Sequence, residues 1–187
     1  MTHGFFSGNP QTEWLTNAAG KDRDMQLLQE FSYTDPDAKK WLAPKGVIIN
    51  GASIPEFLWS TVGSPYTDDY RRASIVHDVA CGDPAIARKD ADTMFYHACR
   101  AGGCGIAQAR VLYTGVRLGA WASTAWPSPA LPLELKMARP LLASPEPEEL
   151  FLRSKLSAIA AELQALDATD TVDAVDAIIA RHVTIQE

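Results

Sequence analysis

The chain has 187 residues, of which 47% are hydrophobic and 21% are charged, and its formal net charge is −6. A chain of this length and balance can bury the core of one compact domain with an appendage. The acidic balance weighs against nucleic acid as a partner, because duplex binding depends on clustered Lys and Arg.

Strands are predicted in the first third of the chain, where short apolar stretches lie between turn residues. Residues 25–33 form one candidate strand, and Trp14-Leu15 could pair with it across a charged turn. Residues 40–49 form another, with a bend at Pro44-Lys45-Gly46, and Asn50-Gly51 closes it.

Helical periodicity begins at Ser53, which can form a capping box with Glu56 at the start of a first helix. A second helix is predicted from Thr67, as its cap, to about Cys81. Two more are predicted over about 84–100 and 106–121. Glycine and proline residues separate these segments.

The last third has a different composition. Residues 127–147 contain many prolines and are predicted to be an extended strap or linker. Residues 148–182 are rich in Ala and Leu and break near 167–170. This pattern predicts two amphipathic helices that pack on the domain or on another copy.

The expected fold is therefore α+β, with a small antiparallel N-terminal sheet followed by a helical bundle. We divide the chain into a core domain (1–126), the Pro-rich strap (127–147) and a C-terminal helical appendage (148–187). No cationic stretch followed by an apolar run opens the chain, and no apolar segment is long enough to span a membrane. We expect cytoplasmic synthesis without a signal peptide, and export only by a signal-independent route or by lysis.

One polar constellation lies on the second and third predicted helices. His77 shares a stripe with small and apolar residues, and Asp92 shares another with Arg88, Phe95 and Tyr96. A buried carboxylate is costly unless it has a partner, and His77 and Arg88 are within reach. We therefore predict a hydrogen bond between His77 and Asp92.

Such a pair has two interpretations. A His held by a carboxylate can take a proton from water, while the adjacent Asp78, turned by about 100° on the helix, could hold calcium or a backbone group. The competing interpretation is a satisfied polar tie between two core helices. Cys81, one turn beyond His77, is interpreted as a small buried cysteine rather than a nucleophile. Ser53 is interpreted as a helix cap.

Four ordered motifs resemble the family known as domain of unknown function 1353, found in bacteria, phages and prophages. They are Ala43–Pro55, Tyr70–Asp78, Arg88–Phe95 and Tyr113–Gly119. The resemblance spans about residues 25–121 and implies a phage-related setting without an assigned activity. Aspartate is usual in that family where this chain has Asn50. If that aspartate is a metal ligand in relatives, Asn50 should bind a cation more weakly.

A more distant likeness is to secreted phospholipase A2, in which His-Asp on one helix precedes Asp and an aromatic residue on the next. This likeness implies that His77 is the base, Asp78 the calcium ligand and Asp92 the orienting residue. The chain lacks that family's disulfide framework and a recognisable glycine-rich calcium loop. The likeness is an analogy of motif order.

The sequence thus supports two hypotheses about function. The first is a small His-Asp hydrolase of phage, prophage or bacterial effector origin that acts on the cell envelope. Calcium could assist this reaction. Arg88, Ser53 and Tyr96 would support its site. The second is a non-catalytic phage or prophage protein that binds another protein, with the Pro-rich strap and the C-terminal helices as its contact surface, or that forms a homo-oligomer through those helices. Inhibition of a host defence system is a further alternative.

Overall fold

The computed structural model describes residues 3–16, 24–51, 54, 69–125, 147–168 and 171–185. The strands are β1 (Phe5–Phe6), β2 (Thr12–Trp14), β3 (Met25–Leu27), β4 (Phe31–Thr34), β5 (Lys40–Ala43) and β6 (Ile48–Ile49). The helices in this part of the chain are α2 (Arg71–Gly82), α3 (Arg88–Gly102), α4 (Ile106–Ala125), α6 (Pro147–Leu163) and α7 (Val172–His182). The predicted α+β class is confirmed.

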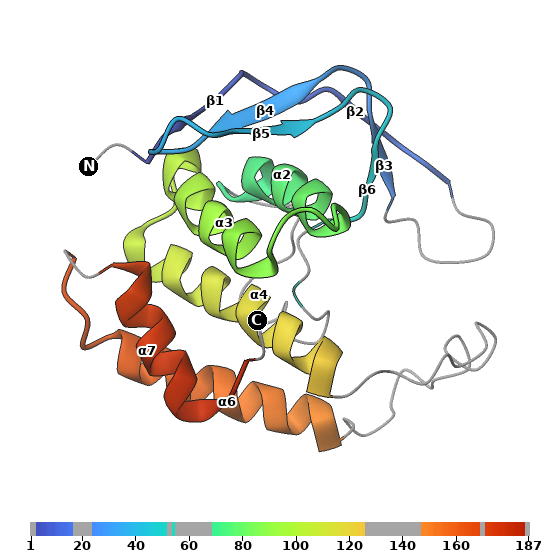
Figure 1. The fold of residues 1–187 in the computed structure, drawn as a ribbon. Coiled ribbons are helices and arrows are strands. Elements are labelled where there is room, and N and C mark those ends of the chain that lie inside the picture. The colour runs from blue at the N-terminus through green and yellow to red at the C-terminus, as the bar shows by residue number, and fades with distance from the viewer. Residues whose placement is uncertain are drawn as a thin grey trace.

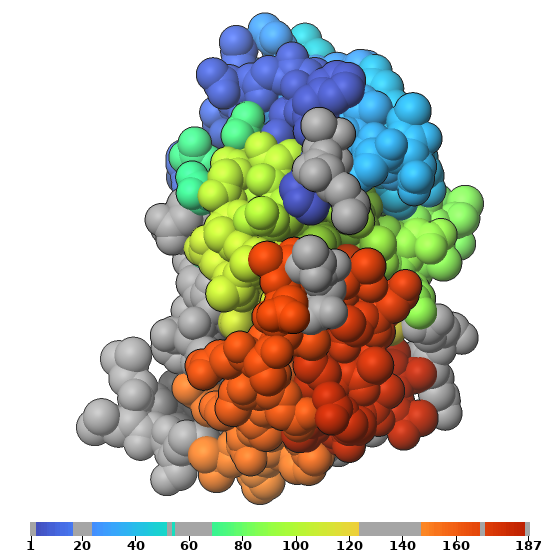
Figure 2. All heavy atoms as spheres, turned by 90° about the vertical axis from the view of Figure 1, so that its left-hand side faces the viewer, coloured from blue at the N-terminus to red at the C-terminus, as the bar shows by residue number. Residues whose placement is uncertain are grey.

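The elements are stacked in layers (Figure 1). The strands cover one side of α2 and α3, α4 lies beneath these helices, and α6 and α7 lie against the far side of α4. Figure 2 shows the same order from another side, with the N-terminal strands at one end and the C-terminal helices at the other. No helix in the described ranges is both long and apolar enough to cross a membrane.

The strands form two antiparallel sheets of three strands each. The strand orders are β1-β4-β5 in one sheet and β2-β3-β6 in the other. The prediction of one strand over 25–33 is wrong, since β3 and β4 belong to different sheets. The strand predicted over 40–49 divides in the same way into β5 and β6, at the Pro44-Lys45-Gly46 bend. Gly46 has φ +85° there and donates its N–H to the Leu27 carbonyl at 2.7 Å.

The bend turns the inner faces of both sheets toward the helices. In β5, Trp41 and Ala43 are buried while Lys40 and Leu42 are exposed, as period-2 alternation requires. The predicted pairing of Trp14 with the next strand is confirmed, because Trp14 lies opposite Met25.

Two helices begin later than predicted. α2 begins at Arg71 and Asp69 lies in the preceding turn, while its predicted cap, Thr67, lies outside the described residues. α3 begins at Arg88 rather than at Pro84. The Asp83 carboxylate accepts the Ala85 N–H at 2.9 Å and holds a turn where the helix was expected. The first predicted helix, apart from Ile54, and residues 127–146 of the strap also lie outside the described residues.

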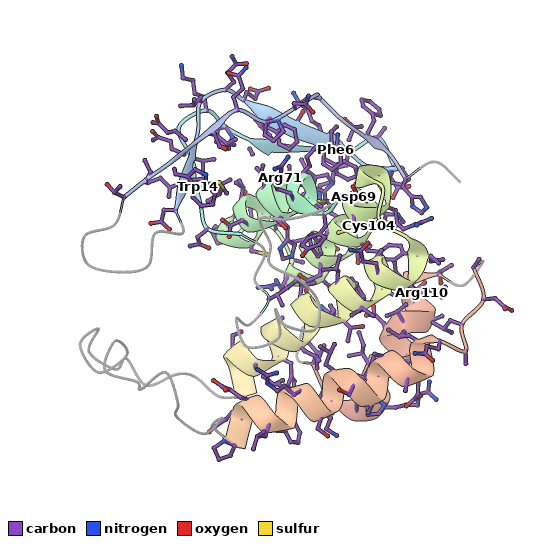
Figure 3. The ribbon with its side chains drawn as sticks, turned by 180° about the vertical axis from the view of Figure 1, so that it is seen from behind. Phe6, Trp14, Asp69, Arg71, Cys104 and Arg110 are labelled. Atoms are coloured by element: carbon purple, nitrogen blue, oxygen red, sulfur yellow. The ribbon has the colours of Figure 1, made fainter. Side chains whose placement is uncertain are left out.

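The two predicted C-terminal helices are confirmed as α6 and α7. Their apolar stripes are buried within this chain rather than displayed for another copy. The connection between them is held by Arg110 of α4 (Figure 3), which donates to the carbonyls of Leu166 at 3.2 Å and Asp167 at 2.5 Å. The buried stripe residues are Leu152, Leu156, Ile159, Leu163, Val172, Val175, Ile178 and Ile179. Leu150 remains exposed, and Phe151 is partly exposed while its ring stacks on Trp121 of α4 with centroids 5.7 Å apart.

Candidate functional site

The centre of the site is a hydrogen bond between two neighbouring helices. His77 of α2 and Asp92 of α3 are each 0% exposed, and Nε2 of His77 lies 2.7 Å from Oδ1 of Asp92. The ring of Phe95 lies beside the imidazole, with 4.7 Å between ring centroids. The predicted contact is therefore confirmed, and it lies in the core between α2 and α3.

The two side chains shift each other's charge in opposite directions. Burial alone would lower the pKa of His77, but the hydrogen bond to Asp92, together with Cys81, raises it to about 9. Burial alone would raise the pKa of Asp92, whereas His77 and Arg88 bring it below its usual value. At neutral pH the pair is therefore an imidazolium bound to a carboxylate.

Two arginines complete the surroundings of Asp92. Nε of Arg88, one turn earlier on α3, lies 3.0 Å from Oδ1, as the sequence led us to expect. Nη1 of Arg117 on α4 lies 3.5 Å from Oδ2, and its side chain is only 4% exposed. Arg117 was not predicted as a site residue. The sequence does indicate that Arg117 is unusual, because it is a charged residue inside a long run of apolar and small residues.

The same charged network continues to the C-terminal helix. Asp176 of α7 lies 3.7 Å from Nε of Arg117 and accepts a hydrogen bond at 2.7 Å from the Tyr113 hydroxyl, 63 positions earlier. Nζ of Lys89 on α3 lies 3.7 Å from the other oxygen of Asp176. The network therefore ties α2, α3, α4 and α7 together.

Asp78 and Asn50, the two predicted metal residues, are brought together by the fold. Oδ2 of Asp78 accepts the backbone N–H of Asn50 at 2.7 Å. Burial raises the pKa of Asp78, and hydrogen bonds from the backbone of Asn50 and Gly51 oppose this. Gly51 has φ +101°, a conformation that favours glycine. The contact seen is thus between a carboxylate and a backbone turn, which was one of the two expectations for Asp78.

Cys81 lies against the same imidazole, with Sγ 3.4 Å from Nε2 and 3.8 Å from Nδ1 of His77. In a nucleophilic triad the nucleophile and the carboxylate occupy opposite ring nitrogens, whereas here both lie nearest Nε2. The geometry therefore disfavours Cys81 as a nucleophile.

His77, Cys81 and Asp92 also form a three-residue group that could hold a metal ion, since their ligand atoms lie within 4.8 Å of one another. Arg88 and Arg117 beside Asp92 oppose an added cation there.

The remaining predicted residues have other surroundings. Tyr96 is buried on α3, and its ring meets Tyr113 and His97 edge-on, with centroids 6.2 Å and 5.3 Å apart. These contacts place Tyr96 in the packing between α3 and α4. Ser53 lies outside the described residues.

Comparison with known proteins finds a match to a protein family whose function is unknown. Residues 25–116 match the family model described as "Protein of unknown function (DUF1353)". Two uncharacterized proteins of Sinorhizobium fredii are similar. One, y4jT, is 32% identical over 144 residues, which cover 77% of this chain and 40% of the relative. The other, y4iH, is 32% identical over 102 residues, which cover 54% and 43%.

The chain therefore spans less than half the length of these two relatives. No solved structure matches it significantly.

Proposed function

Residues 25–116 match the DUF1353 family model, whose family has no assigned activity, and we propose that the protein is a hydrolase of acyl esters in cell-envelope lipids. The geometry of the buried pair supports hydrolysis, and the motif order shared with secreted phospholipase A2 supports the substrate class. His77 is the general base in this proposal, and Asp92 is the positioning residue. The observation that carries it is the 2.7 Å bond from Asp92 to Nε2, because this bond leaves Nδ1 as the nitrogen for proton exchange.

The chemistry requires only groups of this site and water. Nδ1 of neutral His77 takes a proton from water, and the hydroxide adds to the ester carbonyl carbon. The tetrahedral intermediate then collapses and breaks the bond to the alcohol oxygen. That oxygen takes the proton back from Nδ1 and leaves as the alcohol, while the acid remains. Asp92 holds the ring in place and stabilises the imidazolium between these two steps.

The charge and burial of His77 set two conditions on this mechanism. With its pKa raised to about 9, the imidazole is mostly protonated at pH 7, so turnover is expected to rise as the solution becomes alkaline. The ring is also 0% exposed, so the residues around it must part when a substrate binds.

Calcium assistance belongs to the proposal as an accessory. A cation would use oxygens of Asp78 and Asn50, since the Asn50 backbone N–H lies 2.7 Å from Oδ2 of Asp78 at the end of β6. The order of His77, Asp78 and Asp92 is similar to that of secreted phospholipase A2. Against this, one Asp78 oxygen already accepts a backbone N–H. The three cysteines of the chain are also free rather than paired in a disulfide framework. Phage or effector origin and an envelope setting rest on the motif resemblance alone.

The test is hydrolysis of fluorogenic acyl esters and of phospholipid vesicles by the purified full chain. The His77→Gln variant should lose at least about 100-fold in rate, because Gln cannot exchange a proton near neutral pH. The matched control is His182→Gln, since His182 is a partly buried histidine on α7 that is tied to Glu162 at 2.6 Å. Equal rates for wild type and His77→Gln would overturn the proposal. Assays with calcium and with a chelator test the accessory ion.

A second function, a non-catalytic binding protein or an inhibitor of a host defence system, has one observation in its favour. The His77–Asp92 pair is fully buried and extends into the network that ties four helices together, which is what a structural tie requires. In that case His77→Gln would lower the melting temperature and leave the biological effect of the folded protein unchanged.

A further inference from the structure

Two histidines outside the proposed active site face each other across the boundary between the strands and the helices. His3 lies just before β1, His97 lies on α3, and β1 packs against α3 (Figure 1). Nδ1 of His3 is 3.2 Å from Nδ1 of His97, and the ring centroids are 5.5 Å apart. Both side chains are partly buried. The two residues are 94 positions apart, so the fold alone brings them together.

The surrounding structure holds the two imidazoles without using either Nδ1 atom. The backbone carbonyl of His3 accepts a hydrogen bond from the hydroxyl of Tyr33, which is 0% exposed. Gly4 has φ +81°, and a Cβ there would collide with the backbone of β4, so only glycine fits this approach. The ring of Tyr96 meets both imidazoles edge-on, with centroids 6.4 Å from His3 and 5.3 Å from His97.

The two Nδ1 atoms are as far apart as two ligands of one metal ion. Zinc binds imidazole nitrogen at about 2.0–2.1 Å. Two such nitrogens, at an angle between a right angle and the tetrahedral angle, are therefore about 2.8–3.4 Å apart. The observed 3.2 Å lies in this range.

Without an ion, one Nδ1 of the pair carries a proton and donates it to the other. With an ion, both rings carry their proton on Nε2. A rotation of each ring then directs both Nδ1 lone pairs at an ion beside the line that joins them.

The space beside His97 can supply the remaining ligands as water. A cavity of about 250 Å³ adjoins this side chain. Its walls carry charges of both signs, from Asp35, Asp37, Asp90, Lys39 and Lys89. Zinc bound to imidazole and water needs no net charge in the cavity, because its affinity comes from the coordination bonds.

The two rings are also in the protonation state that binds metal. Burial lowers the pKa of both imidazoles, and Arg100 lowers that of His3 further. The charges of Asp35 and Asp37 act in the opposite direction on His97 and so favour a cation there. Both histidines are therefore neutral at pH 7 and need not lose a proton from their rings to bind an ion.

We propose that His3 and His97 bind one Zn²⁺ ion through their Nδ1 atoms, with water from the adjoining cavity in the remaining positions. Imidazole suits zinc, whereas calcium and magnesium prefer oxygen ligands. The ion ties the segment before β1 to α3. Since the protein supplies only two ligands, the ion exchanges with solvent and a chelator removes it. The site shares no residue with the His77–Asp92 pair.

The test is isothermal titration calorimetry of the full chain, without a histidine tag, with zinc chloride. One zinc ion should bind per chain, and magnesium chloride should give no heat of binding. His3→Gln and His97→Gln should each weaken zinc binding at least about 10-fold, since loss of even an outer partner of a metal ligand costs that much. Zinc affinity equal to wild type in either variant would overturn the proposal.

The double variant tests whether the two histidines share one ion. Either single substitution already breaks the chelate, so the double variant should bind zinc no more weakly than the weaker single variant. Additive losses would mean two separate sites and would also overturn the proposal. His3→Gln keeps the carbonyl that accepts the Tyr33 hydroxyl, so this variant should fold and decides the test if His97→Gln does not.

Two control variants separate this site from other groups that could hold zinc. His182→Gln removes the histidine that lies 2.6 Å from Glu162. Cys81→Ala removes one member of the buried group that also contains His77 and Asp92. Both variants should bind zinc like wild type. Loss of zinc binding in either would place the ion elsewhere and overturn the proposal.

Proton positions on the rings give a readout independent of affinity. Long-range proton–nitrogen correlation spectra distinguish a ring protonated on Nδ1 from one protonated on Nε2. Zinc should convert both His3 and His97 to the form protonated on Nε2. A proton that remains on either Nδ1 at saturating zinc would refute coordination through these atoms.

Discussion

The charge of Asp92 holds the buried network together, and its removal should strongly destabilise the fold. Asp92→Asn keeps the shape of the side chain and one acceptor oxygen. It removes the negative charge that His77, Arg88 and Arg117 share at 2.7, 3.0 and 3.5 Å. Arg117 would then remain in the core with Asp176 as its carboxylate, and His77 would have to lose its proton.

The expected loss can be estimated from the burial of these groups. Removing one partner of a buried ion pair costs about 3–5 kcal/mol, because a charge is left in a poorly solvated place. Asp92 and His77 are 0% exposed and Arg117 is 4% exposed, so solvent screening does not reduce this figure much. For a chain of this size each kcal/mol lowers the melting temperature by roughly 2–4 °C. Asp92→Asn should therefore lower it by roughly 6–20 °C.

The assay is thermal and urea unfolding followed by circular dichroism. The control is Asp90→Asn, which makes the same chemical change two residues away on an exposed position of α3, and should stay within about 0.5 kcal/mol of wild type. If Asp92→Asn unfolds within about 1 kcal/mol of wild type, the network contributes little and the energetic reasoning fails.

Three further predictions concern stability. In the folded state the pKa of His77 is about 9, above its ordinary value of 6.5. The stability that its protonated form contributes to the fold is therefore fully present below about pH 6.5 and is lost as the pH rises through 9. The lowered pKa of Asp92 instead gives stability that is lost as pH falls below about 4; urea midpoints across this range test both signs. Gly103→Ala should cost about 1–2 kcal/mol, because φ is +115° there, whereas Gly105→Ala should be nearly neutral; equal melting temperatures would contradict this. Arg110→Met should cost about 1–3 kcal/mol and increase hydrogen exchange in α7, because two carbonyls lose their donor; unchanged exchange would count against it.

Local patterns in the sequence were sufficient to predict the presence of the described helices and the contact of the central pair. The stripe that carries His77 and the stripe that carries Asp92 are properties of single helices, and a short turn joins those helices. Their side chains could therefore be placed in contact without knowledge of the rest of the fold. The break between the last two helices was also visible, because it interrupts an Ala- and Leu-rich pattern.

The strands were less predictable. Residues 25–33 read as one strand, because alternation does not show where a long strand bends to cover two sides of a helical layer. The later start of α3 has a similar reason. Pro84 suits the first turn of a helix, but the Asp83 side chain stabilises a competing turn there. Residue propensities do not show which of these two conformations is more stable.

The outer part of the site was decided by tertiary packing. Arg117 of α4 reaches Asp92, and Asp176 of α7 reaches Arg117. These helices come later in the chain and become neighbours of the pair only when the layers stack. Packing also decided the role of Asp78. Its carboxylate could have held an ion or a backbone turn, and the approach of β6 brings the Asn50 N–H to it. The sequence alone thus determined that His77 and Asp92 had to be buried, because the spacing of apolar residues defines the buried faces of their helices. The stacking of the layers decided which charges met them there, because contacts between distant segments depend on how those faces pack.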